Sequence, residues 1–366
     1  TNKHIKRTIF VPSLLIVDDR YKNRGCMKIL YAIQGTGNGH IARARDIIPV
    51  LREYADTDIL ISGHQCELDL PWPVKFNLKG LGFTFGQKGG IDYKKTFSNN
   101  SLISFFNEVR KLPVHDYDLV ISDFEPVSAW ACKLRRKKCI GISHQSAVTH
   151  EDAPKPANID PAGKFVLKYY APVAKSYGFH FKKLSDNIFT PIIRKEVRFG
   201  QKSNKGHYTV YLPAYSDLKI ISFLSQFPEY HWQVFSKHAR NPYSFQNIKI
   251  RPVNGKEFTK SLLNCEGVFC TAGFETPAEA LYLGKKLFVV PMKLQYEQQC
   301  NAAMLHSMGV PVAKSINDDM IEEFRTWLKS NERVKVRYPD NASRVIEHIL
   351  EETSRSPGYI TIAGAM

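Results

Sequence analysis

The chain has 366 residues, of which 43% are hydrophobic and 23% are charged, a composition typical of a soluble globular protein with room for two domains. No run of eighteen or more apolar residues occurs, so the sequence predicts no membrane-spanning helix. The seven cysteines form no CxxC pair and no metal-ligand spacing, which favours free thiols and a reducing, cytoplasmic location.

The net charge is +16, and the six basic and two acidic residues of the first 26 leave +12 for residues 27–366. Such an excess suits nucleic acid, an anionic membrane surface or an anionic substrate. The main basic cluster, residues 133–138, is typical of a helix C-terminus, and no nucleic-acid-binding motif accompanies it. We therefore predict no nucleic-acid partner. Peripheral association with the anionic inner face of the cytoplasmic membrane stays open.

Residues 1–26 precede Met27, which opens the apolar strand pattern MKILYAI. They show no small-residue cleavage site of a signal peptide. We interpret them as a non-native or upstream extension.

From Met27 onward, apolar strand patterns alternate with helical patterns, which predicts a parallel sheet with helices on both faces. The expected strands are 28–33, 58–62, 118–122 and 139–143, and the expected helices are 41–54, 100–111 and 127–136. Residues 80–99 have five glycines and no clear period, which indicates a loop. Residues 144–207 are irregular, with a helical face over 164–183.

A glycine-rich loop, GTGNGH (Gly35–His40), follows the first strand and opens the first helix. The helix N-terminus attracts anions because its N–H groups are unpaired, so Gly37 and Gly39 are candidates for binding a nucleotide. An NAD site is disfavoured, since His40 stands where a dinucleotide fingerprint needs a small residue and the second strand ends without an acid. A purely structural loop is the alternative.

Three polar side chains at carboxyl ends of strands, or just after them, are candidates for catalysis. A neutral imidazole at a helix N-terminus suits general-base work near pH 7, which favours His40. Asp123 and Glu125 close the strand 118–122, at the edge where open α/β sheets bind ligands, so either could be the base or could orient His40. His40 as a cap of its own loop and Asp123 as a helix N-cap are the alternatives.

A second series of elements begins near residue 207. The expected strands are 208–212, 232–235, 248–251, 266–270 and 287–291, and the expected helices are 217–226, 257–263 and 274–283, with a final helix near 342–352 that returns to the first half. Gly273 and the backbone N–H groups of Phe274, Glu275 and Thr276 open the helix 274–283, where they could hold a diphosphate. The Thr276 hydroxyl could add a further contact.

The stretch 270–310 resembles the C-terminal signature of GT-B glycosyltransferases. It is most similar to the branch that contains the peptidoglycan N-acetylglucosaminyltransferase and the glycosyl transferases of natural-product pathways. The residues that carry the resemblance are Gly273, Thr276, Glu279, Gly284, Pro291, Gln298 and Asn301, with GTGNGH as a second match upstream. The resemblance implies an α/β GT-B fold with two Rossmann-like parallel-sheet domains facing each other across a cleft. Residues 27–190 would form the acceptor domain, 191–340 the nucleotide-sugar donor domain, and 341–366 a C-terminal helix and tail.

The same resemblance assigns individual roles. Glu279 matches the ribose-binding glutamate of the family, Glu297 and Gln298 match the pair that contacts the hexose hydroxyls, and Phe258 matches a residue near the uracil. A solvated helical glutamate and an ordinary core phenylalanine are the alternatives for Glu279 and Phe258. Glu275 replaces a commoner small residue, so its role stays open. No Asp-x-Asp occurs in a loop placed to chelate Mg²⁺ on a diphosphate, and GT-B enzymes use helix dipoles and backbone donors there. We therefore expect no metal and no other cofactor.

The resemblance thus implies a glycosyltransferase that moves a sugar from a nucleotide sugar, with UDP favoured, to an acceptor hydroxyl with inversion. The acceptor would be an unidentified glycan, lipid or small molecule, and the branch suggests the bacterial cell envelope. A nucleotide-sugar 2-epimerase of the same fold and a non-catalytic nucleotide-sugar-binding protein are the alternatives.

Overall fold

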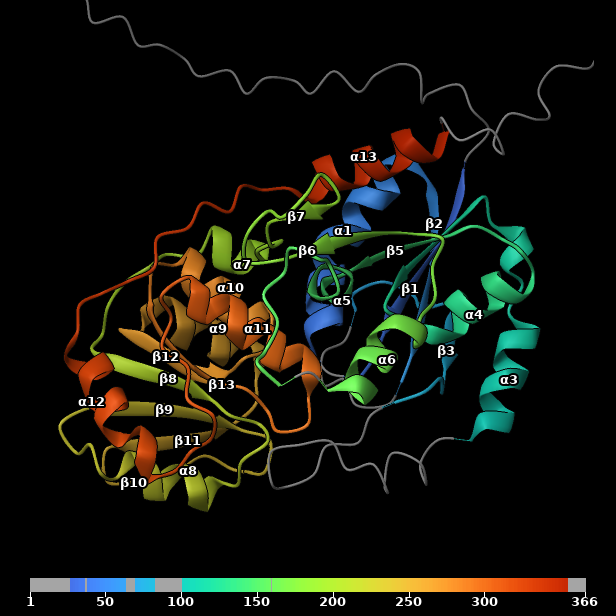
Figure 1. Cartoon of the computed structure of the whole chain (residues 1–366). Coiled ribbons are helices and arrows are strands. Elements are labelled where there is room, and N and C mark those ends of the chain that lie inside the picture. The colour runs from blue at the N-terminus through green and yellow to red at the C-terminus, as the bar shows by residue number, and fades with distance from the viewer. Residues whose placement is uncertain (1–26, 37, 64–69, 83–100, 159, 355–366) are drawn as a thin grey trace, which may run out of the picture.

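A computed structural model describes residues 27–36, 38–63, 70–82, 101–158 and 160–354, which form two α/β halves (Figure 1). Gly37, the extension 1–26, the greater part of the loop 80–99 and the last twelve residues lie outside the described residues. None of the helices in the described part has the length and apolar character needed to cross a membrane.

The first half is built on a seven-stranded sheet in which every neighbouring pair is parallel, in the order β3-β2-β1-β4-β5-β6-β7. Its strands are β1 (Lys28–Gln34), β2 (Asp56–Ser62), β3 (Phe76–Leu78), β4 (Leu119–Asp123), β5 (Cys139–Ser143), β6 (Lys175–Phe179) and β7 (Ile188–Phe189). The near-continuous apolar runs of β1 and β4 are buried on both faces, as parallel strands require. Ile33 pairs with Asp123, so the ends of β1 and β4 lie side by side where the strand order reverses.

Among the described residues, seven helices and one 3₁₀ turn accompany this sheet and the connection to the second half. They are α1 (Asn38–Tyr54), α3 (Leu102–Lys111), η2 (Val114–Asp116), α4 (Pro126–Leu134), α5 (His144–Val148), α6 (Pro161–Tyr169), α7 (Lys195–Arg198) and, from the far end of the chain, α13 (Ala342–Ser354). Side chains cap several of them: the Ser101 hydroxyl accepts from Ser104 N, and the Ser143 hydroxyl accepts from Ser146 N.

The helical interpretation of residues 164–183 is wrong beyond α6. The helix ends at Tyr169, and residues 175–179 form β6, which pairs with β5 and buries Tyr177 and Phe179. The short strand supplies a hydrogen-bonded neighbour for β5, and this tertiary pairing outweighs the local helical pattern.

The second half has a six-stranded sheet in the order β10-β11-β9-β8-β12-β13, parallel except for β10 at the edge. The strands are β8 (His207–Tyr211), β9 (His231–Ser236), β10 (Tyr243–Phe245), β11 (Ile248–Pro252), β12 (Gly267–Thr271) and β13 (Lys286–Val290). The helices are α8 (Asp217–Leu224), α9 (Gly255–Asn264), α10 (Glu275–Tyr282), α11 (Tyr296–Ser307) and α12 (Ile321–Lys329), with the 3₁₀ turn η3 (Asp318–Met320). Strand order reverses between β8 and β12, which places the start of α10 at a second switch point.

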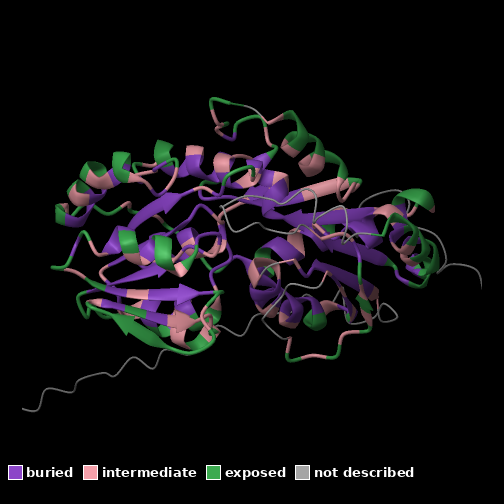
Figure 2. Ribbon diagram, turned by 90° about the horizontal axis from the view of Figure 1, so that it is seen from below, coloured by how far each residue is buried: buried purple, intermediate pink, exposed green. Residues whose placement is uncertain are grey.

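The last helix, α13, returns to the first half and packs against α1, as the sequence predicts (Figure 1). The Tyr54 hydroxyl of α1 donates to Glu347 Oε1 at 2.7 Å. Buried apolar residues of both halves form one continuous cluster that includes Ile41, Phe179 and Phe274. The strands of both sheets are largely buried while the outer helix faces are exposed (Figure 2).

Candidate active site

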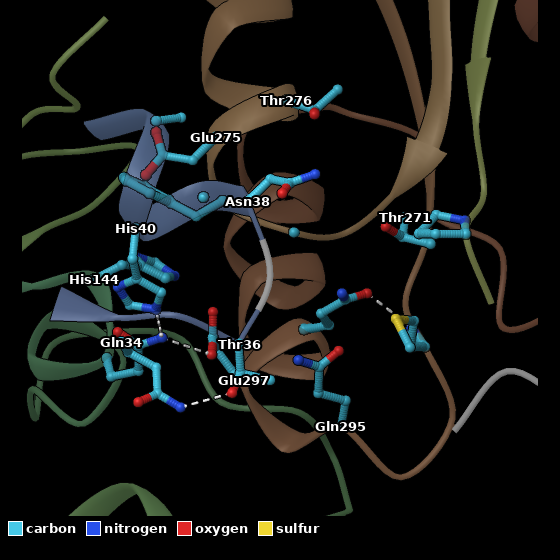
Figure 3. Close-up of a pocket in the computed structure, with 18 of the residues that line it drawn as sticks. Gln34, Thr36, Asn38, His40, His144, Thr271, Glu275, Thr276, Gln295 and Glu297 are labelled. Carbon is cyan, nitrogen blue, oxygen red and sulfur yellow. Dashed lines mark hydrogen bonds between the residues drawn. The ribbon is translucent and has the colours of Figure 1, made fainter. Parts of the chain in front are cut away.

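A cavity of about 540 Å³ lies between the two halves and is lined by residues from both (Figure 3). A cavity of this volume can enclose a ligand of several hundred daltons. Its walls come from α6 and the segments that follow β1, β4 and β5 in the first half, and from the segments that follow β8, β9, β11, β12 and β13 in the second. His40 and Asn38 of α1 and Glu275 and Thr276 of α10 line it where the two halves meet (Figure 3).

His40 and Asp123 form a hydrogen-bonded pair at the edge of this cavity. Imidazole Nδ1 lies 2.7 Å from Asp123 Oδ1, and the His40 side chain is 13% exposed while Asp123 is fully buried. A carboxylate only accepts, so Nδ1 carries a proton, and in the neutral imidazole Nε2 then has the free lone pair. The Gln145 amide nitrogen, 3.4 Å from His40 Nε2, is placed to donate to that lone pair.

Arg43, one helical turn after His40, holds the Asp123 carboxylate from the other side. Its NH2 group donates to Oδ1 at 2.7 Å and to Oδ2 at 2.9 Å, and the Tyr31 hydroxyl donates to Oδ2 at 3.3 Å. Burial alone would raise the pKa of Asp123, but the charge of Arg43 and the hydrogen bonds from Arg43 and His40 hold it below its usual value. Asp123 is therefore an anion at neutral pH.

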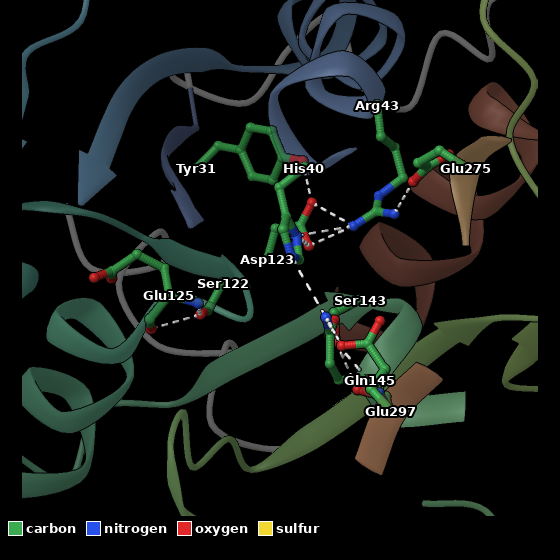
Figure 4. Close-up of polar contacts among 11 residues, drawn as sticks. Tyr31, His40, Arg43, Ser122, Asp123, Glu125, Ser143, Gln145, Glu275 and Glu297 are labelled. Atoms are coloured by element: carbon green, nitrogen blue, oxygen red, sulfur yellow. Dashed lines mark hydrogen bonds and ion pairs between the residues drawn. The ribbon is translucent and has the colours of Figure 1, made fainter. Parts of the chain in front are cut away.

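Glu125 has a structural position instead. Its side chain caps α4, accepting from Val127 N at 2.7 Å and Ser128 N at 2.6 Å, and the Ser62 hydroxyl donates to Oε1 at 2.6 Å. The residue is fully buried, it is not among those that line the cavity, and Figure 4 shows its carboxylate directed away from Asp123. The structure thus brings His40 and Asp123 together and leaves Glu125 out of the cavity.

The backbone between these two acids is strained. Phe124 has φ 55°, a left-handed conformation that residues other than glycine rarely adopt. Its ring lines the cavity and lies 4.9 Å from the ring of Tyr170. The turn separates Asp123, which faces His40, from Glu125, which faces α4.

At the start of α10, Gly273 faces open space. A Cβ added at Gly273 would meet no atom within 4 Å, and the residue lines the cavity together with Phe274 and Thr276. Glu275 also lies there, at the first position of the helix, and its Oε1 accepts from Arg43 NH1 at 2.5 Å. Burial raises the pKa of Glu275 to about 7 against the opposing charge of Arg43, and the charge of Glu279 adds to the rise.

Glu279 lines the cavity but is not solvated. Arg194, in the segment before α7, donates from Nε to Oε1 at 2.5 Å and from NH2 to Oε2 at 2.7 Å. The Glu279 side chain is only 3% exposed. Each carboxylate oxygen keeps a second acceptor position, so a ligand hydroxyl could still donate to it.

The segment after β13 contributes the other predicted polar residues. Glu297 Oε2 accepts from the Gln145 amide at 3.0 Å, and Gln298 Oε1 accepts from Met292 N at 2.9 Å, which leaves the Gln298 amide nitrogen as a donor. Phe258 of α9 lines the cavity with its ring 5.6 Å from that of Tyr211.

Asn301 joins the two halves without lining the cavity. Its Oδ1 lies 2.6 Å from His144 Nε2, and its amide donates to the Ala272 carbonyl at 3.0 Å. The His144 ring stacks on Phe274 with centroids 3.8 Å apart. These contacts fix α5 against the turn that precedes α10.

Two buried amide oxygens in the cavity wall have no hydrogen-bond partner among the described residues: Gln34 Oε1 and Gln145 Oε1. Gln34 is 3% exposed and Gln145 is 6% exposed. A buried acceptor without a donor is costly, so a ligand hydroxyl that donates to either would remove that cost. The sequence places Gln145 at the carboxyl end of a strand, but sequence reasoning missed Gln34, Arg43 and Arg194.

In the described part of the chain, no three His, Cys, Asp or Glu side chains are grouped so as to hold a metal ion. A metal-independent reaction stays a prediction.

Comparisons with known proteins agree with this architecture. The model of the family described as glycosyl transferase family 1 matches residues 27–329. A search of curated protein sequences found no significant match.

Among solved structures, the chain is similar to a UDP-glucosyltransferase from Polygonum tinctorium (12% identity, TM-score 0.58, covering 91% of this chain and 94% of that one). It is also similar to UGT89C1 of Arabidopsis thaliana, solved with UDP (11% identity, TM-score 0.56, 89% and 99%). MurG of Acinetobacter baumannii is a third example (13% identity, TM-score 0.52, 91% and 100%). At such identities the likeness shows the fold, and the predicted GT-B fold is confirmed.

Proposed function

The chain belongs to glycosyl transferase family 1 and is a glycosyltransferase, and from this premise we propose that it moves a sugar from a UDP-sugar to an acceptor hydroxyl, with inversion and without a metal ion. The single observation that carries the proposal is the His40–Asp123 pair, with a 2.7 Å hydrogen bond on Nδ1 and an accepting Nε2 at the cavity.

His40 is the general base in this proposal. Its Nε2 takes the proton of the acceptor hydroxyl while the oxygen attacks the anomeric carbon, and the Gln145 amide yields its place to that hydroxyl. The anionic Asp123 holds the tautomer and stabilises the imidazolium that forms. The attack comes from the side opposite UDP, so the bond between the anomeric carbon and the UDP oxygen breaks, UDP leaves and the anomeric centre is inverted.

The donor occupies the side formed by the second half. The diphosphate lies at the start of α10, where the space in front of Gly273 and the Thr276 hydroxyl can receive it. Glu297 and Gln298 contact the hexose. Relatives of the same fold were solved with UDP or a UDP-sugar analogue, which supports UDP as the nucleotide.

Glu279 contacts the ribose as part of a pair with Arg194. The arginine fixes the carboxylate, and each oxygen offers its remaining lone pair to a ribose hydroxyl. Phe258 packs beside the uracil.

The acceptor occupies the side formed by the first half. Phe124, Val166, Leu167 and Tyr170 give this part of the cavity an apolar wall, and Gln34 offers one unpaired acceptor atom beside it. An acceptor with an apolar portion and a hydroxyl group fits this lining.

The test is a thermal-shift screen across nucleotide sugars, because a ligand that binds only the folded protein raises its melting temperature. NMR analysis of the products formed from the best donor and a pool of hydroxylated acceptors follows. The expected result is UDP and a new glycoside of inverted configuration. Release of nucleotide with an altered free sugar and no glycoside would instead indicate an epimerase.

A further inference from the structure

Four charged or titratable side chains form a continuous chain of contacts across the boundary between the halves (Figure 4). His40 contacts Asp123 at 2.7 Å, Asp123 contacts Arg43 NH2 at 2.7 Å, and Arg43 NH1 contacts Glu275 at 2.5 Å. The first three residues belong to the first half, whereas Glu275 lies 232 positions beyond Arg43, on α10 of the second half.

Arg43 is the only member that contacts carboxylates of both halves. Its side chain is 2% exposed, and its planar guanidinium directs one NH2 group to Asp123 and the other to Glu275. A lysine carries the same charge but has a single compact ammonium group, which cannot reproduce this fork. The orientation of the guanidinium therefore depends on both carboxylates.

A glycine gives Glu275 room to approach the first half. A Cβ added at Gly39 would lie 3.3 Å from Glu275 Cγ, tighter than most such contacts. The Glu275 side chain is 17% exposed and lies against Arg43, next to the His40–Asp123 pair, instead of extending into solvent. The Gly39 position, next to His40, thus lets the donor-side carboxylate reach the buried arginine.

We propose that Glu275 is a positioning residue for the catalytic base: through Arg43 it fixes the Asp123 carboxylate that orients the His40 imidazole. The base is then fully oriented only while α10, which carries the donor, is in contact with α1. This inference rests on the proposed role of His40.

A simpler explanation is that Glu275 stabilises the start of α10, where a carboxylate favours the helix dipole. That effect needs no Arg43. If Glu275 acts through Arg43, changing Glu275 should have no further effect once Arg43 has been replaced. If Glu275 only stabilises the helix, the effect should persist.

The experiment compares four proteins: wild type, Glu275→Gln, Arg43→Lys and the double variant. Arg43→Lys keeps a positive charge beside the buried Asp123, which favours folding. Glu275→Gln should lower kcat about tenfold, by loss of one charged hydrogen bond, and change the donor KM little. In the Arg43→Lys background it should have no further effect, because the fork is already lost. Additive effects on kcat, or a change confined to the donor KM, would overturn the proposal.

A matched control is Glu266→Gln. Glu266 is paired with Arg333, its side chain is 18% exposed, and it precedes β12 at the end of the strand away from the cavity. Glu266→Gln makes the same substitution at an arginine-paired glutamate of similar exposure outside the cavity, so it should leave kcat unchanged. A loss of kcat equal to that of Glu275→Gln would show that the effect does not come from the contacts of Glu275 with Arg43 and, through it, with Asp123 and His40.

A second readout does not depend on turnover. In ¹⁵N-labelled protein, the Nδ1–H proton of His40 reports its hydrogen bond to Asp123, and its resonance should shift in Glu275→Gln and not in Glu266→Gln. An unchanged resonance would refute the coupling. If His40→Ala retained wild-type turnover, the proposed base would be wrong, while the resonance would still show whether Glu275 acts on His40.

Discussion

Arg194 donates to both carboxylate oxygens of Glu279, at 2.5 and 2.7 Å, across 85 positions of the chain. The Glu279 side chain is 3% exposed and that of Arg194 is 16% exposed, so little water is available to replace either partner. The cost of breaking a pair of this kind comes mainly from the charge left behind.

We therefore expect Glu279→Ala to affect both stability and nucleotide binding. Helix propensity alone would make alanine harmless at this position, but the unpaired Arg194 should cost about 3–5 kcal/mol of unfolding free energy. Loss of a charged hydrogen bond to the ribose should weaken UDP binding about ten- to a hundred-fold. Denaturant unfolding and calorimetric titration of UDP measure the two effects.

The matched variant is Arg194→Met with Glu279→Ala, which removes both charges. It should recover much of the lost stability without recovering UDP affinity. If the double variant bound UDP like the wild type, Glu279 would have no part in the donor site.

A second prediction concerns the base. His40→Ala should lower kcat by about 10²–10⁴-fold with little change in donor KM, because the imidazole acts on the acceptor and not on the nucleotide. Steady-state kinetics with the donor identified by the thermal-shift screen provide the measurement. The control is His306→Ala, a change at the far end of α11 from the cavity that should leave kcat unaffected.

Wild-type turnover in His40→Ala would move the general-base role to another group. Glu125 would be a poor replacement, since it caps α4 inside the protein.

A third prediction concerns metal dependence. Backbone N–H groups at the start of α10 are proposed to stabilise the leaving diphosphate, so turnover should persist in EDTA. Assays with and without added Mg²⁺ or Mn²⁺ after chelation test this. A requirement for either ion would contradict the proposed mechanism.

A fourth prediction concerns pH. Burial raises the pKa of Asp46 on α1 to about 6, although it accepts a hydrogen bond from Lys195 N. A carboxyl group whose pKa is raised in the folded state stabilises below its unfolded pKa, near 4, and loses that contribution as pH rises through about 6. This group should therefore lower the unfolding free energy by up to about 3 kcal/mol between pH 4 and pH 7.

Asp46→Asn removes this titration. Its unfolding free energy, measured in urea at several pH values, should lack the decline that the wild type shows across that interval. Parallel pH profiles for the two proteins would show that Asp46 titrates normally.

The central strands could be predicted from the sequence because their side chains are buried on both faces and read as continuous apolar runs, as in β1 and β12. The strands β3, β6, β7 and β10 were missed. β3, β7 and β10 have only two or three residues, and β6 lies in a stretch with a helical pattern, so the formation of all four depends on pairing with a neighbour already in the sheet.

The residues of the candidate site likewise fall into those that a local sequence pattern predicts and those that depend on distant partners. His40 and Gly273 carry local signals, a glycine-rich loop and a turn before a helix. The importance of Arg43 and Arg194 arises from partners 232 and 85 positions away, which no local pattern reports. One signal for Arg43 was present: it follows His40 by three positions on a helix whose neighbouring residues are apolar, so it shares a buried face with the histidine.

The last prediction concerns Gly273, at the turn between β12 and α10. A methyl group at this position meets no protein atom within 4 Å, so Gly273→Ala should fold with an unchanged melting temperature. The methyl group would project into the space proposed for the diphosphate, and a steric conflict of about 1–3 kcal/mol corresponds to roughly 5- to 150-fold weaker UDP binding. Gly267→Ala, at the other end of β12, should lower the melting temperature and leave UDP affinity unchanged. Its Cβ would lie 2.9 Å from Tyr208 Cε1, within the core and away from the cavity. Calorimetric titration and thermal melts of both variants separate the two effects. UDP affinity equal to that of the wild type in Gly273→Ala would place the diphosphate elsewhere in the cavity.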